Sequence, residues 1–206
     1  MSVGIIDYGM GNIGSLSNAV YSQGWDPILI SSPETFTDIS HLIIPGVGSY
    51  SSARQTLADR KRCDLIIEFV RQGKPILGIC LGMQLLSDFG SEGGNSSGFG
   101  FIPGNVLPLK KLEGLNLPHV GWNEIVHTKD HPILEGIKPN IDFYFVNGYF
   151  FIPDDYEAVV SLTEYGQKFP SIIAKNNIVG VQFHPEKSQT NGLKIIDNFC
   201  LWDGKC

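Results

Sequence analysis

The chain has 206 residues, of which 42% are hydrophobic and 17% are charged, and its formal net charge is -6 at pH 7. This composition is typical of a globular protein, and the length fits one large domain or two small ones. The acidic balance argues against nucleic acid or an anionic membrane surface as the main partner, so we expect a small polar substrate or another protein.

The cysteines and the apolar runs restrict the class of protein further. No segment is long and apolar enough to span a bilayer, and the N-terminus enters the apolar stretch 3–7 without a basic start or a cleavage site. We therefore expect a cytoplasmic protein. Neither a zinc site nor a disulfide framework is predicted, because no C-x-x-C spacing occurs, and neither a metal nor a cofactor is expected. Reduced thiols are expected at Cys63, Cys80, Cys200 and Cys206.

The first half of the chain alternates predicted strands and helices. Leu16, Ala19 and Val20 fall at helical spacing before Gly24, which is typical of a helix end. Such alternation predicts an α/β fold, with right-handed crossovers onto a mostly parallel central sheet and helices on both faces. The predicted order is strand 3–7, helix 15–23, strand 26–31, strand 41–44, one or two helices over 53–70, and strand 75–79.

The second half is predicted to be rich in strands. A glycine- and serine-rich loop, 90–98, comes first, and a last helix is expected over about 191–202. We find no repeat, linker or composition break, so residues 1–206 are interpreted as a single domain. The segments predicted to be extended are 104–109, 119–127, 142–151, 157–163, 171–175 and 179–184, the last two flanking a hairpin turn at Asn176 and Asn177.

One cysteine stands between two glycines at the end of an apolar run. Gly78 and Gly82 allow strand and helix to approach closely, so Cys80 is expected to stand exposed on a strained turn between them. The same mechanical principle operates in the G-x-S-x-G nucleophile elbow, here with sulfur in place of oxygen. Backbone amides and a helix N-terminus facing the sulfur favour a thiolate. Taken alone, the motif is equally compatible with a buried structural cysteine.

A histidine and a carboxylate follow a predicted strand near the end of the chain. Alternation along an extended segment puts His184 and Glu186 on one face and Phe183 on the other. A cysteine nucleophile needs a base to take and return a proton, and a carboxylate to orient that base. A single histidine is usually structural, but these two residues together supply what Cys80 requires.

Two glycine-containing loops follow other strands. The Pro45–Gly48 loop could turn backbone amides toward an oxyanion and, together with the Leu81 amide, form an oxyanion hole; by itself it reads as an ordinary strand-to-helix turn. Residues 9–14 match G-x-G-x-x-G, but the second strand ends in Ser31 and Ser32 and lacks the acidic residue that a dinucleotide site requires. We favour a turn without a ligand there.

Together these motifs resemble the class I (triad-type) glutamine amidotransferases. The resemblance rests on G-I-C-L-G-M-Q at 78–84 and Q-F-H-P-E at 182–186. More closely, P-G-V-G at 45–48, G-W-N at 121–123 and H-P-E-K-S at 184–188 are similar to the family of glutaminase subunits of imidazole glycerol phosphate synthase. The resemblance covers essentially the whole chain and implies a single-domain, flavodoxin-like class I glutamine amidotransferase fold.

The resemblance implies a reaction and a set of site residues. Cys80 would attack the side-chain amide of L-glutamine, His184 would move protons and Glu186 would orient the histidine. Ammonia would leave for a TIM-barrel cyclase subunit in histidine biosynthesis, and water would cleave the glutamyl thioester. The oxyanion hole would be formed by Val47, Gly48 and Leu81. The substrate would be bound by Gly48, Gln84, Glu92, Gly148 and Tyr149. The cyclase would be contacted by Asn12, Trp122, Asn123 and Lys187.

One segment departs from the family pattern. Where the family usually reads Val-His-Ser/Thr-Tyr, residues 146–149 read Val-Asn-Gly-Tyr, so a hydroxyl that could contact glutamine is missing at Gly148. The acceptor pathway therefore stays open, since similar subunits supply ammonia to a sugar amidotransferase in surface-polysaccharide biosynthesis. A non-catalytic subunit that lost glutamine binding and a nucleotide-binding module based on residues 9–14 are two further hypotheses.

Overall fold

The computed structural model describes residues 2–36, 39–59 and 62–205. Its first half follows the predicted order of strands and helices. The region 53–70, predicted to be helical, contains parts of two helices, and its residues 60 and 61 lie outside the described residues. The elements are β1 (Ser2–Ile6), α1 (Ile13–Ser22), β2 (Asp26–Ile30), the 3-10 helix η1 (Pro33–Phe36), β3 (His41–Ile44), α2 (Tyr50–Asp59), α3 (Cys63–Arg71) and β4 (Ile76–Ile79).

The second half is rich in strands, as predicted. The predicted strand 142–151 is divided in two at Gly148, and the predicted strand 179–184 ends at Val181. The elements are α4 (Leu81–Gln84), β5 (Phe89–Gly90), β6 (Ser96–Ser97), β7 (Gly104–Pro108), β8 (His119–His127), η2 (Pro132–Leu134), β9 (Ile141–Asn147), β10 (Tyr149–Pro153), η3 (Tyr156–Ala158), β11 (Val159–Glu164), β12 (Lys168–Lys175), β13 (Ile178–Val181), η4 (Pro185–Lys187) and α5 (Gln189–Leu201).

In the described part of the chain, nine strands form one sheet in the order β2-β1-β3-β4-β13-β12-β11-β8-β9. The strands from β2 to β13 are mutually parallel, whereas β12, β11, β8 and β9 each run antiparallel to their neighbours. The parallel half is the half that carries Cys80. Val181 pairs with Ile79, so β13 and β4 end at the same edge of the sheet. Cys80 and the segment after Val181 therefore leave the sheet side by side.

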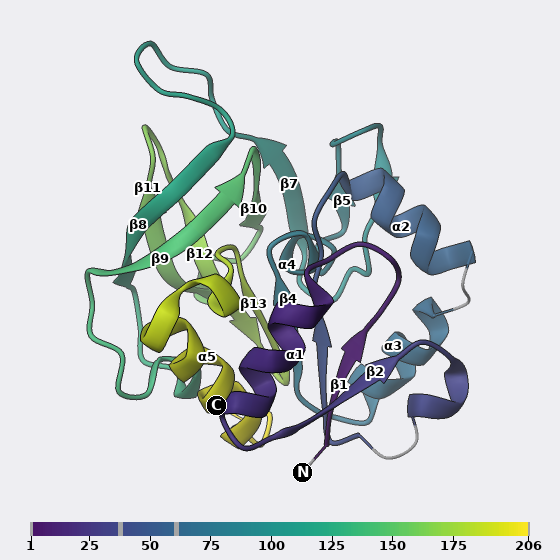
Figure 1. Cartoon of the computed structure of the whole chain (residues 1–206). Coiled ribbons are helices and arrows are strands. Elements are labelled where there is room, and N and C mark those ends of the chain that lie inside the picture. The colour runs from purple at the N-terminus through teal and green to yellow at the C-terminus, as the bar shows by residue number, and fades with distance from the viewer. Residues whose placement is uncertain (1, 37–38, 60–61, 206) are drawn as a thin grey trace.

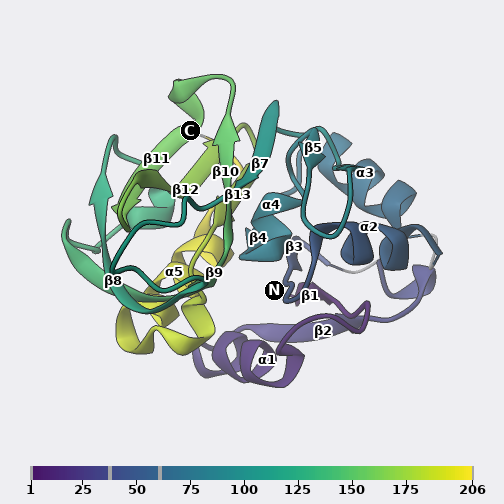
Figure 2. The same ribbon diagram turned by 90° about the horizontal axis from the view of Figure 1, so that it is seen from above.

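Helices cover both faces of the parallel half. Ile43 of β3 packs on the face covered by α1 and α5, whereas its neighbours Leu42 and Ile44 pack on the face covered by α2 and α3. Figures 1 and 2 show α1 and α5 together on one side of these strands and α2 and α3 on the other. β3 and β4 are buried on both faces, and apart from His41 at the start of β3 their residues are apolar or glycine.

Consecutive strands β9 and β10 belong to different sheets. β10 pairs with β7 in a second sheet of the described residues, in the order β10-β7-β5-β6. The chain turns at Gly148, between the two sheets, and the loop between β7 and β8 projects beyond them (Figure 1).

Two further features bear on the sequence predictions. No helix among the described residues is long and apolar enough to cross a membrane. Cys63, Cys80 and Cys200 are free thiols, and Cys206 lies outside the described residues. The expectation of reduced thiols is therefore met at the three cysteines that the structure describes.

Candidate active site

Cys80 occupies a strained turn between β4 and α4. Its φ of 53° and ψ of -110° are unusual for a residue with a side chain, and such conformations cost about 1–3 kcal/mol and cluster at functional sites. Two backbone hydrogen bonds hold the turn, since the Cys80 amide donates to the Val181 carbonyl at 2.8 Å and the Cys80 carbonyl accepts from the Gln84 amide at 3.2 Å. The turn is thus fixed to β13, the strand that leads to His184.

The two glycines around Cys80 are required by close backbone contacts. A Cβ atom on Gly82 would lie 1.8 Å from the carbonyl oxygen of Ile44, and a Cβ atom on Gly78 would lie 2.6 Å from the carbonyl oxygen of Gly82. Any side chain at either position would overlap backbone atoms that cannot rotate away. The close approach of strand and helix predicted for Gly-x-Cys-x-Gly is therefore confirmed.

The sulfur of Cys80 is buried, and the expectation of an exposed cysteine was wrong. Cys80 is only 6% exposed, because β9 and β13 pack over the turn. Its Sγ lies 3.6 Å from the carbonyl oxygen of Val146 in β9 and 3.7 Å from Nε2 of Gln182, which follows β13. The Gly-x-Cys-x-Gly motif determines the shape of the turn, whereas its exposure depends on contacts with residues far away in the sequence.

His184 and Glu186 form the predicted pair, but by a different local structure. Nδ1 of His184 lies 2.9 Å from Oε1 of Glu186, and both side chains are 4% exposed. The pair does not arise from strand alternation, because β13 ends at Val181 and His184 caps the N-terminus of η4. Proline at position 185 suits the first turn of this 3-10 helix and brings the carboxylate back onto the imidazole.

The imidazole of His184 interacts with Cys80 on one side and Glu186 on the other. Burial lowers the pKa of His184, but the negative charge of Cys80 and hydrogen bonds to both neighbours raise it more, to about 10. The site thus favours a protonated imidazole beside the sulfur. Such an arrangement can activate a thiol as a nucleophile and then return a proton to a leaving group.

The Pro45–Gly48 loop lies against the same turn. The hydroxyl of Tyr8 donates to the Pro45 carbonyl at 2.8 Å, and a Cβ atom on Gly46 would lie 2.5 Å from that hydroxyl. A Cβ atom on Gly46 would also lie 2.9 Å from Cβ of Leu81, so this loop and the start of α4 are in contact. Val47 is 43% exposed and Gly48 has a φ of +112°, which favours glycine.

The cavity beside the pair is about the size of one water molecule. Its volume is about 10 Å³, and one carboxylate oxygen that faces the interior, Oε2 of Glu186, has no hydrogen-bond partner among the described residues. Cys80, Gln84 and Tyr149 do not line it, so this small cavity is not the space expected to hold glutamine. The cavity is lined by Asn12, Leu16, Pro45, Gly46, Val47, Ile79, His184 and Glu186.

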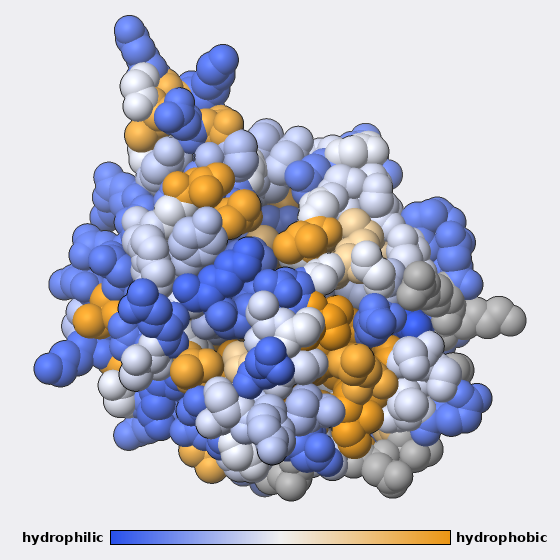
Figure 3. All heavy atoms as spheres, in the orientation of Figure 1, coloured by the Kyte–Doolittle hydropathy of each residue, from blue (hydrophilic) through white to orange (hydrophobic). Residues whose placement is uncertain are grey.

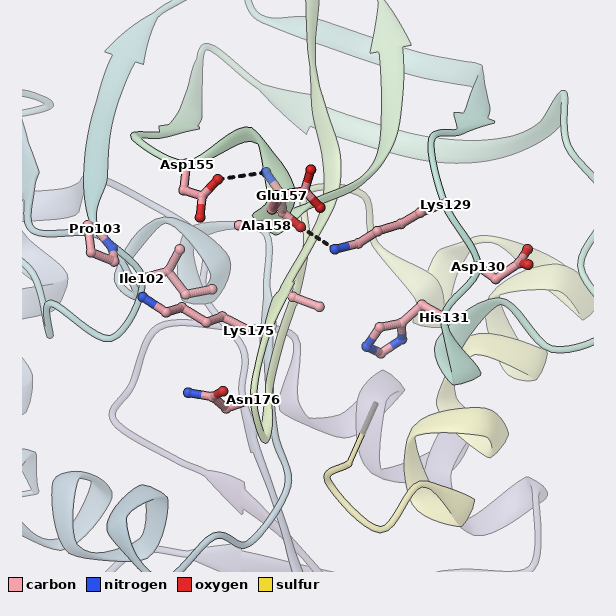
Figure 4. Close-up of a pocket in the computed structure, with 11 residues that line it drawn as sticks. Ile102, Pro103, Lys129, Asp130, His131, Asp155, Glu157, Ala158, Lys175 and Asn176 are labelled. Atoms are coloured by element: carbon pink, nitrogen blue, oxygen red, sulfur yellow. Dashed lines mark hydrogen bonds between the residues drawn. The ribbon is translucent and has the colours of Figure 1, made fainter.

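A larger cavity, of about 300 Å³, lies elsewhere in the fold (Figure 4). It contains Lys175 and Asn176, which precede β13, whereas the site follows the carboxyl end of β13. Figure 4 shows Lys129 donating to the Glu157 carbonyl beside this cavity. The parallel register of β13 and β4 places the cavity at the edge of the sheet opposite Cys80. It therefore has no part in the chemistry of Cys80.

Comparison with known proteins identifies the family. The sequence model of class-I glutamine amidotransferases matches residues 4–202. The chain belongs to the class-I glutamine amidotransferase family. A curated relative from Methanocaldococcus jannaschii, imidazole glycerol phosphate synthase subunit HisH, is 46% identical over 198 residues, which cover 96% of this chain and 97% of the relative. The HisH subunit of Sulfurimonas denitrificans is 43% identical over 200 residues, with 96% of each chain covered.

Solved structures agree on the fold of this amidotransferase. A glutamine amidotransferase from Thermotoga maritima superposes with a TM-score of 0.68, and the match covers 97% of this chain and 82% of that protein. The PurLQS structure from Thermotoga maritima gives a TM-score of 0.74, with 97% of both chains covered. Each is 17% identical in sequence, so this likeness shows the fold alone. The predicted α/β amidotransferase fold is confirmed.

The residues expected to bind substrate lie on both sides of the amidotransferase turn. Nε2 of Gln84 donates to the Tyr149 carbonyl at 3.0 Å, so these two residues are in contact near Cys80. Gly148 precedes Tyr149, and a Cβ atom there would meet only Pro118, at 3.7 Å, so the fold leaves room for a side chain. Packing therefore does not explain why this chain has glycine at position 148.

Glu92 lies next to the loop that ends at Gly48. Its Oε2 accepts a hydrogen bond from the Tyr50 amide at 3.3 Å, at the N-terminus of α2. Burial raises the pKa of Glu92, and the hydrogen bond from Tyr50 offsets part of that effect. The carboxylate thus has one fixed donor and remains partly exposed. It is placed to accept further hydrogen bonds from a ligand.

All four residues expected at a partner interface are exposed or partly exposed. Asn12 caps α1 and is exposed. Trp122 is 47% exposed and packs edge-on against Tyr144, and Nζ of Lys187 lies 5.8 Å from the centre of the Tyr144 ring. Figure 3 shows hydrophobic residues gathered over the upper ends of β8 and β9. Asn123 faces the other side of β8 and donates to the Glu164 carbonyl at 2.9 Å.

Sequence reasoning did not single out two residues that the structure places at important positions. Gln182 is fully buried and contacts Cys80. In the sequence, the only indication of this was a polar residue directly after an apolar strand.

The second residue is Arg62, which is 4% exposed. Its guanidinium donates to the Asp7 and Ser31 carbonyls at the ends of β1 and β2. The guanidinium therefore lies at the ends of β1 and β2, two neighbouring strands of the parallel half of the sheet.

Proposed function

We propose that this chain is the glutaminase subunit of an imidazole glycerol phosphate synthase. It hydrolyses L-glutamine to glutamate and ammonia, and it delivers the ammonia to a TIM-barrel cyclase subunit in histidine biosynthesis. The observation that carries the chemistry is the contact of Cys80 with a histidine that Glu186 holds at 2.9 Å. The pathway is supported by relatives named HisH that are 38–46% identical over nearly the whole chain.

The first half-reaction forms a glutamyl thioester on Cys80. The sulfur attacks the side-chain amide carbon of glutamine, and the protonated His184 gives its proton to the leaving nitrogen, so that ammonia departs. Glu186 keeps the imidazole in place and stabilises its charged form. The amides of Gly48 and Leu81, with the Val47–Gly48 peptide turned inward, stabilise the tetrahedral oxyanion.

The second half-reaction releases glutamate. Neutral His184 takes a proton from a water molecule, which attacks the thioester carbon, and the bond between carbon and sulfur breaks. The Cys80 sulfur leaves as a thiolate, and the imidazole regains its charge beside it. Each cycle therefore restores the starting state of Cys80 and the protonated histidine that the electrostatics of the site favour. Gln84, Glu92 and Tyr149 hold the amino-acid end of the substrate throughout.

Partner binding regulates this site. Gly46 and Val47 line the small cavity beside His184 and Glu186, so movement of this loop changes the surroundings of the pair. Because Val47 is 43% exposed, a cyclase that contacts Asn12, Trp122 and Lys187 can also reach this loop. We expect weak glutaminase activity from the isolated chain and full activity only in the cytoplasmic complex with the cyclase. Full turnover without any partner would count against this gating.

The central experiment is Cys80→Ala, assayed in the complex with the cyclase and its acceptor ligand. Glutamate formation should be abolished, since no other residue can form the thioester. Cys63→Ala is the matched control, because Cys63 is a free thiol in α3 that contacts Arg54 rather than His184. Retained turnover in Cys80→Ala would refute the triad assignment. A glutamine-directed electrophile should label Cys80 in the assembled complex, and failure to label it would favour a non-catalytic subunit.

A second candidate is a glutaminase subunit that supplies a sugar amidotransferase. It is favoured by one observation, the Asn147–Gly148 segment that departs from the family pattern. Identification of the chain that co-purifies with this protein separates the two candidates. A barrel-forming cyclase supports histidine biosynthesis, whereas a sugar amidotransferase in the same complex supports the alternative.

A further inference from the structure

Gln182 connects two residues of the proposed site by its side chain. It is fully buried directly after β13. Its Nε2 donates to Sγ of Cys80 at 3.7 Å, and its Oε1 accepts from Nε2 of Gln84 at 3.1 Å. The reaction described above assigns no role to Gln182, although a buried side-chain amide persists in a core only when its hydrogen bonds are made.

The hydrogen bonds of Gln84 have a fixed direction. Its Nε2 has two N–H groups, and these donate to the Tyr149 carbonyl at 3.0 Å and to Oε1 of Gln182 at 3.1 Å. If the Gln84 amide were turned over, its oxygen would face the Tyr149 carbonyl, which cannot donate. If Gln182 were turned over, its Nε2 would face Nε2 of Gln84, and neither group could accept the hydrogen bond. The Tyr149 carbonyl therefore determines the orientation of Gln84, and Gln84 determines that of Gln182.

One atom of the network is left without a protein donor. No described residue donates a hydrogen bond to Oε1 of Gln84. Because both N–H groups of Gln84 are already used, this side chain can offer a ligand only an acceptor. Of the two groups at the amino-acid end of glutamine, the α-ammonium has N–H donors and the α-carboxylate has none.

We propose that Gln182 is a positioning residue that holds the Gln84 amide in the orientation that accepts a hydrogen bond from the α-ammonium group of the substrate. The proposal rests on the proposed glutaminase function and adds a determinant of substrate selection to it. Gln182 selects for the ammonium group through Gln84. Gln182 also donates a hydrogen bond to the Cys80 sulfur. Loss of that hydrogen bond should change the rate with every substrate by the same factor.

The test compares Gln182→Met with Gln182→Glu in the complex with the cyclase. Methionine keeps the length of the side chain but removes the acceptor for Gln84, whereas glutamate keeps that acceptor. Each variant is assayed with L-glutamine and with glutaramate, which is glutamine without its amino group. Loss of a hydrogen bond to a charged group is worth about tenfold in kcat/KM or more. We expect Gln182→Met to lower the preference for L-glutamine over glutaramate by about that factor.

The conservative variant and a control separate this role from a structural one. Gln182→Glu should keep the wild-type preference even if its kcat falls, because only the hydrogen bond to the sulfur is lost. Ser161→Ala removes the buried hydrogen bond between Ser161 and Ser171, 2.8 Å long, in the neighbouring strands, and should leave the preference unchanged. If methionine does not allow folding, Gln182→Leu takes its place, because leucine also lacks an acceptor for Gln84.

The outcomes distinguish the two proposals. Equal loss of activity toward both substrates in Gln182→Met, or loss of the preference in Gln182→Glu, would overturn the positioning role while leaving the glutaminase function in place. A wild-type complex that does not hydrolyse glutamine would overturn the glutaminase function and this inference with it.

Discussion

Substitution of Gly82 by alanine tests whether the backbone contact behind Cys80 shapes the site. The added Cβ atom would lie 1.8 Å from the carbonyl oxygen of Ile44 and 2.8 Å from its carbonyl carbon. Ile44 ends β3, which pairs with β4 through Ile44 and Gly78, so the carbonyl is held in the sheet. The strain must therefore be relieved by movement of the turn that carries Cys80.

The size of the effect follows from the kind of contact. Overpacking in a core costs about 1–3 kcal/mol, and we expect about 3 kcal/mol here because a backbone carbonyl cannot rotate aside. For a chain of this length, each kcal/mol shifts the melting temperature by about 2–4 °C, which gives a fall of about 6–12 °C. A displacement of the sulfur by about 1 Å would lower kcat by about 100-fold.

Thermal unfolding and glutaminase activity of the complex measure the two effects. Gly14→Ala is the matched control, since a Cβ atom there meets nothing within 4 Å and the residue lies in α1. In a helix this change is worth about 0.5–1 kcal/mol in stability, so the melting temperature should rise. If Gly82→Ala matched the wild type in both melting temperature and kcat, the steric account of the turn would be refuted.

Two further predictions concern His184 and Gly148. Because the folded pKa of His184 is raised to about 10, its contribution to stability is present below about pH 6.5 and is lost as the pH rises through the folded value. Cys80→Ala removes the largest contribution that raises this pKa, so a lower pKa should be measured by NMR titration, and an unchanged value would contradict the contact of the two residues. Gly148→Ser should change the free energy of unfolding by less than about 0.5 kcal/mol, since its Cβ atom meets only Pro118, at 3.7 Å. The new hydroxyl should lower the KM for glutamine in the complex, and an equal or higher KM would show that this position does not contact the substrate.

Local sequence patterns were sufficient to predict most of the parallel half of the sheet. Buried parallel strands give continuous apolar runs, so β3 was predicted with its observed bounds. The Gly-x-Cys-x-Gly turn was predictable because glycine is required wherever two backbones approach closely. His184 and Glu186 were paired correctly although β13 ends at Val181, because the 3-10 helix that begins at Pro185 brings Glu186 back to the imidazole.

Other features of the site depend on contacts between residues far apart in the sequence, which local patterns do not predict. The burial of Cys80 depends on Val146, 66 positions away in the sequence, and no local pattern reports such a contact. The role of Gln182 depends on Gln84, 98 positions away. The division of the predicted strand 142–151 at Gly148 follows from pairing with two different sheets, since β9 joins β8 and β10 joins β7. Each of these features needs the topology before it can be inferred.

In the Pro45–Gly48 loop, Gly46 is held by the core, whereas Gly48 can change its backbone conformation. Gly46 lies against Tyr8 and Leu81, so the first part of the loop cannot move without displacing the core. A Cβ atom on Gly48 would meet only the flexible end of Met10, and glycine at this position can adopt either sign of φ. A change in the conformation of this loop is therefore expected to occur by rotation of the Val47–Gly48 peptide. If this peptide supplies an amide to the oxyanion hole, as proposed above, contact of a cyclase with the exposed Val47 would also change the stabilisation of the oxyanion.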